Sequence, residues 1–219
     1  LIGVGGGAPA GGSGEQYFIG HFDGRTFTSE NPKEMVLWAD YGADAYAAQT
    51  WSDAPDDRRL AISWMNNWAY AREIPTGSWR GAMTLPRALS LAATAGGTRL
   101  RQQPVAELTA LRDSGQRWTN QAIAPGKYVE LAKADGALWE ICADFDFTAH
   151  TPTRFGLRLV WPGGEFVSVG YDVQNGQLFV DRTKAGVDDF HEAFAAVHVA
   201  PLKPTTGMLR LHLFLDHSS

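Results

Sequence analysis

The sequence predicts an all-β protein in two parts, and three patterns support this prediction. From about residue 126 onward, apolar and polar residues alternate along short segments, as in half-buried antiparallel strands. Before residue 90 the strand-like segments are richer in aromatic residues and apolar on both faces, as in strands buried between layers. The pair Asn175-Gly176 separates two alternating segments and is a strong hairpin signal. The later part is therefore predicted to be a β-sandwich.

The first part opens on a glycine-rich stretch, "GGGAPAGGSG", at residues 5–14. This stretch lacks the Lys-Ser/Thr ending and the following helix of a phosphate-binding loop, so we expect a flexible loop. Residues 15–24 predict a strand that ends in an Asp23-Gly24 turn, and residues 35–42 predict a short apolar strand. Short strands joined by turns are therefore expected here.

A longer hairpin is predicted next. Residues 44–51 and 58–68 are strand-like, and a loop containing Pro and Asp connects them. In a continuous strand, Trp64, Asn66 and Trp68 would point to one side. We expect Trp64 to pack in the interior and Trp68, at the strand end, to face a binding site. Three other tryptophans are expected in the core: Trp38, Trp51 and Trp79.

Asp40 and Asp44 bracket a tight glycine-containing turn, and Tyr46 follows on the predicted strand. Three uses of the paired carboxylates stay open. They could act on a glycosidic bond, accept hydrogen bonds from sugar hydroxyls, or cap the turn itself. These residues are therefore candidates for substrate contact and equally for a structural role.

The two parts are predicted to meet at a linker. We place the first part at residues 1–90, a linker with a short helix at 91–112, and the sandwich at 113–219. Residues 102–112 carry the helix signal, because Pro104 stands near the start and apolar residues recur at helical spacing.

Composition argues against several classes of function. The chain has 219 residues, a formal net charge of −5 and no basic stripe, so nucleic acid is not an expected partner. One cysteine, Cys142, excludes an intrachain disulfide and a cysteine zinc site, and neither a metal nor a cofactor is expected. The apolar runs are too short to span a membrane.

The first residues include no initiator Met and no signal peptide, so we expect the sequence to be a piece of a longer protein.

Five long segments, taken in order, resemble one protein family. They are "GGAPAGGSGEQYFIGHFDGRTF" (6–27), "WADYGADAYAAQTW" (38–51), "SWMNNWAYAREIPTGSWRGAMTLPRALSL" (63–91), "QQPVAELTALR" (102–112) and "GYDVQNGQLFVDRTKAGVDDFHEAF" (170–194). The family is glycoside hydrolase family 32, which contains levanases, exo-inulinases and invertases. The resemblance covers essentially the whole chain.

The resemblance implies a fold and a reaction. The fold is a partial five-bladed β-propeller, the last blade or so, followed by a truncated β-sandwich. The reaction is hydrolysis of β-fructofuranosidic bonds in levan, inulin or sucrose with retention, which needs two carboxyl groups about 5 Å apart. The family carries its three catalytic carboxylates in W-M-N-D-P-N-G, R-D-P and E-C motifs, and none of these is in the sequence. The chain alone is therefore expected to be inactive, and its parent protein to be extracellular or periplasmic.

Only substrate contacts carry over from the family to this sequence. Trp68 matches a tryptophan that lines the fructose pocket, and residues 40–46, which hold Asp40, Asp44 and Tyr46, match the turn and strand that approach it. Two family residues differ in this turn, where Ala43 replaces a common Lys and Ala45 a common aromatic residue.

Two other interpretations stay open. The sandwich could bind polysaccharide without cutting it, which would need exposed coplanar aromatic residues on one sheet. Trp139 and Trp161 fall instead on apolar faces, as core residues do. The chain could also be an interaction fragment, because the apolar strand at 209–215 would keep an open edge.

Overall fold

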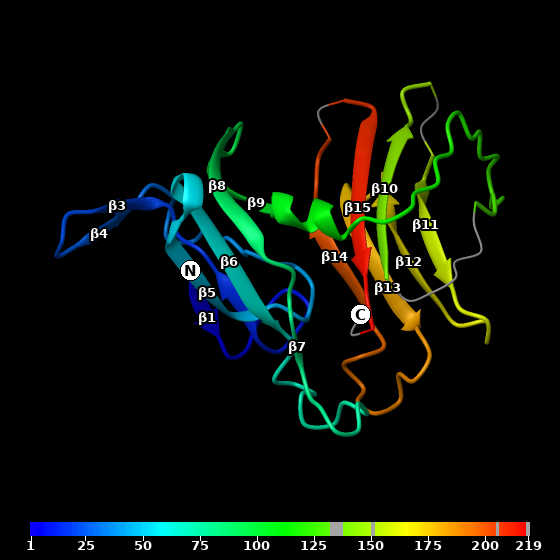
Figure 1. Ribbon diagram of the computed structural model, residues 1–219. Coiled ribbons are helices and arrows are strands. Elements are labelled where there is room, and N and C mark those ends of the chain that lie inside the picture. Colours follow the sequence, from blue (N-terminus) through cyan, green and yellow to red (C-terminus); the bar gives the residue numbers. More distant parts are fainter. Residues whose placement is uncertain (132–137, 150–151, 205, 218–219) are drawn as a thin grey trace.

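The computed structural model describes residues 1–131, 138–149, 152–204 and 206–217. Figure 1 shows two β-rich parts side by side, with strands β1 to β9 in one and β10 to β15 in the other. The described residues contain two short 3-10 helices and no α-helix. None of their helices has the length and apolar character needed to cross a membrane. The prediction of an all-β fold is confirmed.

The first part is built around an antiparallel sheet in the order β5, β6, β8, β9, with β7 beside β6. Two small hairpins, β1 with β2 and β3 with β4, accompany it. The strands are β1 (Ile2–Val4), β2 (Gly14–Gln16), β3 (Gly20–Phe22), β4 (Phe27–Ser29), β5 (Tyr46–Ala54), β6 (Arg58–Met65), β7 (Ala82–Met83), β8 (Arg87–Thr94) and β9 (Gly97–Pro104). This sheet is consistent with one blade of a propeller.

The long hairpin of the first part is confirmed. β5 pairs antiparallel with β6, and the 3-10 turn η1 (Pro55–Asp57) connects them. Ala61 and Ser63 are buried on one face of β6, and Trp64 is half-buried on the other. Both faces of this strand are therefore covered, as its apolar composition predicts.

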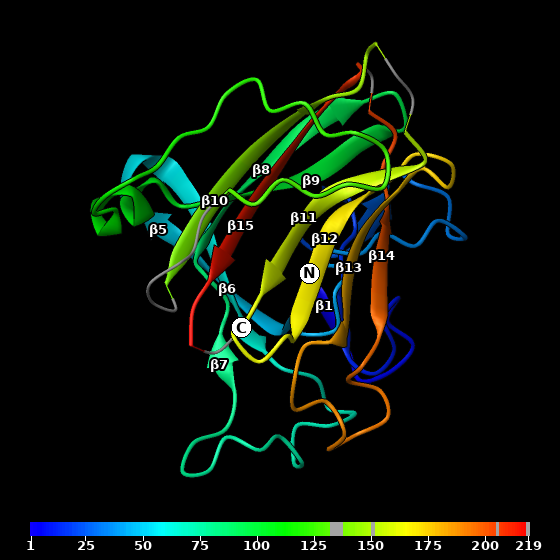
Figure 2. The ribbon, with the colours of Figure 1, turned by 90° about the vertical axis from the view of Figure 1, so that its right-hand side faces the viewer.

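The second part is a β-sandwich, as predicted. One sheet has the order β11, β12, β13, β14, and β10 pairs with β15 in the other (Figure 2). The strands are β10 (Trp139–Asp146), β11 (Arg154–Val160), β12 (Phe166–Asp172), β13 (Gln177–Lys184), β14 (Val197–Pro201) and β15 (Met208–Leu215). The Asn175-Gly176 pair lies in the β12–β13 hairpin, where Asp172 Oδ1 accepts a hydrogen bond of 2.9 Å from the backbone N–H of Asn175.

The predicted alternation builds the core of the sandwich. Inward-facing residues of both sheets meet around Tyr171, Leu209 and Leu211, which are buried. The apolar side chains packed against these three are Phe145, Phe147, Phe155, Val169, Val173, Leu178, Leu202 and Leu213. The polar residues between them on β10 and β15 face outward, so each strand has one buried face.

The predicted boundary and helix need correction. Residue 90 falls inside β8, and β8 and β9 form a hairpin within the first sheet, so that sheet continues to Pro104. The expected helix at 102–112 shrinks to a 3-10 helix, η2 (Ala106–Leu111). Its apolar repeat does not pack as a stripe, because Leu111 is 80% exposed.

Other strand and core predictions were also wrong. Residues 35–42 form no strand and contribute only a single bridge between Trp38 and Gln16. Trp51, Trp79 and Trp161 are exposed rather than core residues. Trp51 lies on β5, at the edge of its sheet, and Trp161 follows the last residue of β11. The alternation argument fails at such edges and ends because no second layer covers them there.

The core cluster predicts a large effect for one substitution. Leu211→Ala removes a buried side chain from β15 and should lower the free energy of unfolding of the sandwich by about 2–5 kcal/mol. Urea denaturation followed by circular dichroism measures this. Met208→Ala, at an exposed position of the same strand, is the matched control and should cost less than about 1 kcal/mol. Equal losses for the two variants would contradict this assignment of the core.

Candidate functional site

An exposed tryptophan packs at the end of a short row of aromatic rings that are tilted against one another. Trp68 is 55% exposed, and its ring centroid lies 4.9 Å from that of Trp64. The ring of Trp64 lies 6.4 Å from that of Tyr46, its cross-strand partner on β5. We call Tyr46, Trp64 and Trp68 the aromatic cluster. It offers solvent a flat indole surface of the kind that lines small-molecule sites.

Strand alternation does not produce this cluster. β6 ends at Met65, and Asn66 is only 1% exposed, so it does not share the open side with Trp68. The segment after β6 is a turn, in which the backbone carbonyl of Asn67 accepts hydrogen bonds from the N–H groups of Tyr70 and Ala71. The prediction that Trp64, Asn66 and Trp68 share one face is therefore wrong for Asn66.

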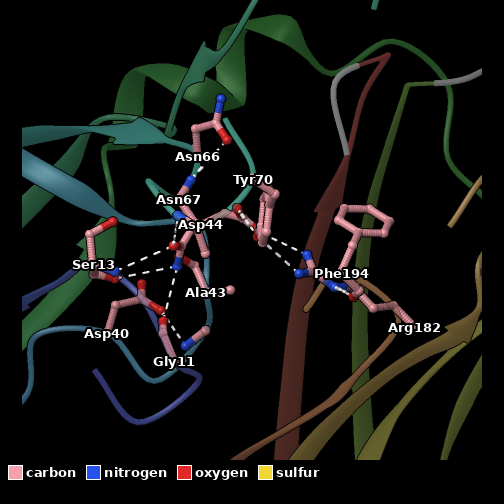
Figure 3. A network of polar contacts seen from close by, with 12 residues as sticks. Gly11, Ser13, Asp40, Ala43, Asp44, Asn66, Asn67, Tyr70, Arg182 and Phe194 are labelled. Atoms are coloured by element: carbon pink, nitrogen blue, oxygen red, sulfur yellow. Dashed lines mark hydrogen bonds and ion pairs between the residues drawn. The ribbon is translucent and has the colours of Figure 1, made fainter. Parts of the chain in front are cut away.

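The side chain of Asn67 holds this turn from inside the protein (Figure 3). Its Nδ2 donates to the backbone carbonyls of Ala43, at 2.8 Å, and Gly11, at 3.1 Å. Its Oδ1 accepts from the backbone N–H of Ala69, at 2.9 Å, and of Ser13, at 3.3 Å. A single buried amide thus joins three segments that are far apart in the sequence.

The glycine-rich loop is anchored to Asn67 at its end, through Gly11 and Ser13, and the flexibility expected for the rest of the loop stays a prediction. Gly12 has a φ of +63°, and a Cβ at this position would lie 1.9 Å from Asn67 Oδ1. Only glycine allows this approach in this backbone conformation. Ser13 is fully buried, and its Oγ accepts a hydrogen bond of 3.1 Å from the backbone N–H of Trp68. The loop therefore supports the turn that carries Trp68.

Asp40 caps the turn that begins at this residue. Its Oδ1 accepts a hydrogen bond of 2.8 Å from the backbone N–H of Gly42. Its Oδ2 lies 2.9 Å from Nη1 of Arg87 on β8. Among the three predicted uses of this carboxylate, the geometry realises the turn cap and adds an ion pair. A contact between Asp40 and a sugar stays a prediction.

Asp44 faces the second part of the molecule. Its Oδ2 lies 2.6 Å from Nη1 of Arg182 on β13, and its Oδ1 accepts a hydrogen bond from the hydroxyl of Tyr70. Burial, and then the charge of Asp44, raise the pKa of Tyr70 well above its usual value, so the phenol remains a donor. Both aspartates are thus engaged within the protein, which suits positioning better than proton transfer.

A group of possible metal ligands lies elsewhere, on the outer face of the sandwich. Glu140, Cys142 and His212 on β10 and β15 have ligand atoms within 4.8 Å of one another. Arg112 already holds Glu140 through two bonds of 2.5 and 2.6 Å, and this hydrogen bonding lowers the pKa of Glu140 to about 2. His212 Nε2 lies 2.8 Å from the same carboxylate. The ion-pair network accounts for the grouping, and we assign it no function.

Sequence reasoning found the aromatic cluster but missed the residues that hold it. Asn67, Tyr70 and Arg182 were not proposed as site residues. Strand alternation would place Arg182 on the same face as the core residue Leu178, but the pairing of β13 with β12 is irregular between Asp181 and Lys184, so only the tertiary arrangement reveals its role. The two amides beside Trp68 in "NNW" draw attention to this turn, but they do not indicate which side chain is buried.

Comparisons with known proteins agree on one family. A model of the glycosyl hydrolases family 32 N-terminal domain matches residues 2–104. The model of the glycosyl hydrolases family 32 C-terminal region matches residues 107–219. A levanase from Bacillus subtilis is 46% identical over 221 residues, and an extracellular exo-inulinase from Aspergillus niger is 36% identical over 222 residues. The chain spans 33% of the levanase and 41% of the exo-inulinase.

Solved structures are similar in fold. The exo-inulinase from Aspergillus awamori superposes with a TM-score of 0.80 at 31% identity, over 98% of this chain and 43% of that one. A β-fructofuranosidase from Schwanniomyces occidentalis, complexed with fructosyl-erythritol, gives a TM-score of 0.78 at 25% identity, over 98% of this chain and 45% of that one.

The role of Asn67 predicts a large effect for an isosteric change. Asn67→Asp keeps the shape but points a carboxylate at the carbonyls of Ala43 and Gly11, so the free energy of unfolding should fall by about 3 kcal/mol or more. Thermal and urea denaturation measure the loss. Gln116→Glu, an equal change of charge at an exposed position, should have almost no effect. A stable Asn67→Asp variant would contradict the proposed anchoring.

His198 on β14 predicts a dependence of stability on pH. Burial, and then the charge of Arg182, lower the pKa of His198 below 6.5, although Asp44 and Asp40 act in the opposite direction. The unfolded chain then binds the proton more readily, so this stability is present above about pH 6.5 and is lost as pH falls toward the folded pKa. His198→Gln should flatten the decline in unfolding free energy between about pH 7 and 5. The exposed His21→Gln should leave it unchanged, and an unchanged slope in both variants would refute the assignment.

Proposed function

The chain belongs to glycoside hydrolase family 32, and from this premise we propose that it is part of a retaining β-fructosidase acting on fructans or sucrose. In this proposal it supplies one wall of the fructose pocket, and the carboxylates that perform the reaction come from outside these residues. The parent enzyme is proposed to be secreted, in keeping with relatives named extracellular exo-inulinase.

The observation that carries the proposal is the exposed ring of Trp68 on a fixed support. A ring held by Trp64 from one side and by a buried hydrogen-bond network through its backbone loses little freedom when a ligand packs on it. Relatives of this chain are named levanase and exo-inulinase, and a similar solved structure was complexed with a fructosyl compound. Trp68 is therefore the residue that we assign to the sugar.

In this proposal the chain helps to bind the substrate, and carboxylates outside these residues break the glycosidic bond. Retaining hydrolysis needs a nucleophile and an acid/base group on either side of the glycosidic bond. Asp40 and Asp44 are held in ion pairs with Arg87 and Arg182, so neither is proposed for these roles. The contribution of this chain is to orient the fructosyl ring, which supplies binding and alignment but no bond breaking.

The alternative of a carbohydrate-binding sandwich receives less support. It needs aromatic rings that form one exposed platform on a sheet. Trp161 is exposed just after β11, whereas Trp139 is half-buried on β10, and these strands belong to different sheets. Their placement does not suit one flat polysaccharide-binding surface.

The purified chain should release no fructose from levan, inulin or sucrose. Loss of the nucleophile, the proton donor and the charge stabiliser together removes nearly all of the rate enhancement. Reducing-sugar and fructose assays measure this against buffer alone. Fructose release at enzymatic rates would contradict the proposed division of labour.

A chimeric enzyme tests the proposal directly. The stretch of the Bacillus subtilis levanase that aligns with this chain is replaced by the chain itself. The chimera should hydrolyse levan, and Trp68→Ala within it should lower kcat/KM about tenfold, by loss of aromatic packing on the sugar.

Trp161→Ala is the matched control for this chimera, because it also removes an exposed tryptophan but lies in the sandwich. It should leave kcat/KM unchanged. A folded but inactive chimera would contradict the family function proposed for the chain. An active chimera that is insensitive to Trp68→Ala would remove Trp68 from the site.

A further inference from the structure

We propose that Arg182 is a positioning residue through which the sandwich fixes the segment that carries Trp68. This inference rests on the proposed function, in which Trp68 is the residue assigned to the sugar. It adds that the second part of the molecule takes part in building the site, although none of its residues is assigned to the sugar.

Each nitrogen of the Arg182 guanidinium makes a contact, and two of these contacts cross the boundary between the two parts (Figure 3). Nη1 lies 2.6 Å from Asp44 Oδ2, and Nη2 donates to the hydroxyl oxygen of Tyr70 at 2.9 Å. Nε donates to the backbone carbonyl of Phe194 at 2.5 Å. The Tyr70 hydroxyl donates in turn to Asp44 Oδ1, so three side chains close a ring of hydrogen bonds. The planar fork of arginine fits this arrangement, and a lysine could not reproduce it.

Two of the three side chains in this ring of hydrogen bonds are largely shielded from water, and the third, Asp44, is 25% exposed. The Arg182 side chain is only 12% exposed, and Tyr70 is 2% exposed. Two phenylalanines from the loop after β13, Phe190 and Phe194, pack edge-on against Tyr70, with ring centroids 6.2 and 5.6 Å away. The Arg182 guanidinium also lies 4.1 Å from the Phe194 ring centroid. In such surroundings an ion pair interacts more strongly than at a surface, and breaking one partner is costly.

Tyr70 contacts Asn67 directly, and Asp44 is next in the sequence to a residue that does. Tyr70 donates its backbone N–H to the carbonyl of Asn67 at 3.2 Å, which closes the turn containing Trp68. Asp44 follows Ala43, whose carbonyl accepts the hydrogen bond from Asn67 Nδ2. Arg182 therefore contacts two segments: through Tyr70 it holds the turn that contains Trp68, and through Asp44 it holds the turn whose carbonyl binds Asn67. No contact between Arg182 and Trp68 is needed for this effect.

Hydrogen–deuterium exchange of the 219-residue chain tests the proposal without any sugar. Arg182→Met keeps the length of the side chain but removes the three donors. Amides at 66–72 and 43–47 should exchange about tenfold faster or more, because a partly buried charged pair is broken. Those of β10 and β15 should keep their rates. Arg182→Lys should give an intermediate increase, since it restores the charge but not the fork.

Arg210→Met is the matched control. Arg210 also makes a two-bond ion pair, with Asp144, but both groups are exposed and both lie within the sandwich. This variant should leave exchange at 66–72 unchanged. The indole N–H resonance of Trp68, assigned with Trp68→Phe, should shift in Arg182→Met and stay in place in Arg210→Met.

Two outcomes would overturn the proposal. One is unchanged exchange at 66–72 in Arg182→Met, and the other is a uniform increase that includes β10 and β15, which marks a general loss of stability. If Arg182→Met does not fold, Tyr70→Phe replaces it, because this change removes only the hydroxyl from the ring of hydrogen bonds and should give the same local pattern. Since no readout involves a fructoside, failure here is distinct from failure of the proposed function.

Discussion

The arrangement around Trp68 depends on one buried amide. Asn67 is almost fully enclosed, and both of its polar atoms are paired with backbone groups of other segments. Leaving such groups unpaired in the interior costs about 1–3 kcal/mol each, so the segments that satisfy Asn67 are strongly favoured in one arrangement. The glycine-rich loop, the turn before β5 and the turn after β6 are thereby locked together. The exposed indole is a consequence of this locking, because its own backbone N–H is bound to Ser13.

The second part of the molecule also contacts the segments around Trp68, through the side chain of Arg182. Arg182 extends from β13 to Asp44 and Tyr70, both of which are neighbours of the Asn67 network. The sandwich therefore does more than bury its own core around Tyr171, Leu209 and Leu211. A hydrophobic contact between the two parts would hold them together without fixing directions, whereas a guanidinium fork fixes both distance and orientation. This difference is why we propose that the sandwich fixes the segment of a tryptophan that it does not touch.

Much of the fold could be predicted from the sequence because it follows from local periodicity. Alternation predicted the strands β10 and β15, and the Asn175-Gly176 pair predicted the hairpin between β12 and β13. The structure contains these elements. The failures have a common physical origin. Trp51 and Trp79 were placed in a core because aromatic residues are usually buried, but burial depends on what covers a strand, which periodicity does not contain. The helix at 102–112 failed because only part of its apolar repeat is covered: Val105 is buried, whereas Leu111 is exposed.

For the candidate site too, some residues could be predicted from the sequence and others could not. Trp68 and Tyr46 could be found from the resemblance and from their place at strand ends. Asp40 and Asp44 could be found too, but whether each carboxylate meets a sugar or an arginine depends on Arg87 and Arg182, which are distant in the sequence. Asn67 was overlooked because nothing local indicates that its side chain, and not that of Trp68, is the buried one.

A crystal structure of the levanase chimera with bound fructose tests the central claim most directly. The account predicts that the fructosyl ring lies against the exposed face of Trp68, with carbon atoms within about 4 Å of the indole. It also predicts that Asp44, Tyr70 and Arg182 keep their ring of hydrogen bonds in that complex. A fructose bound in the active site without contact to Trp68 would contradict the account.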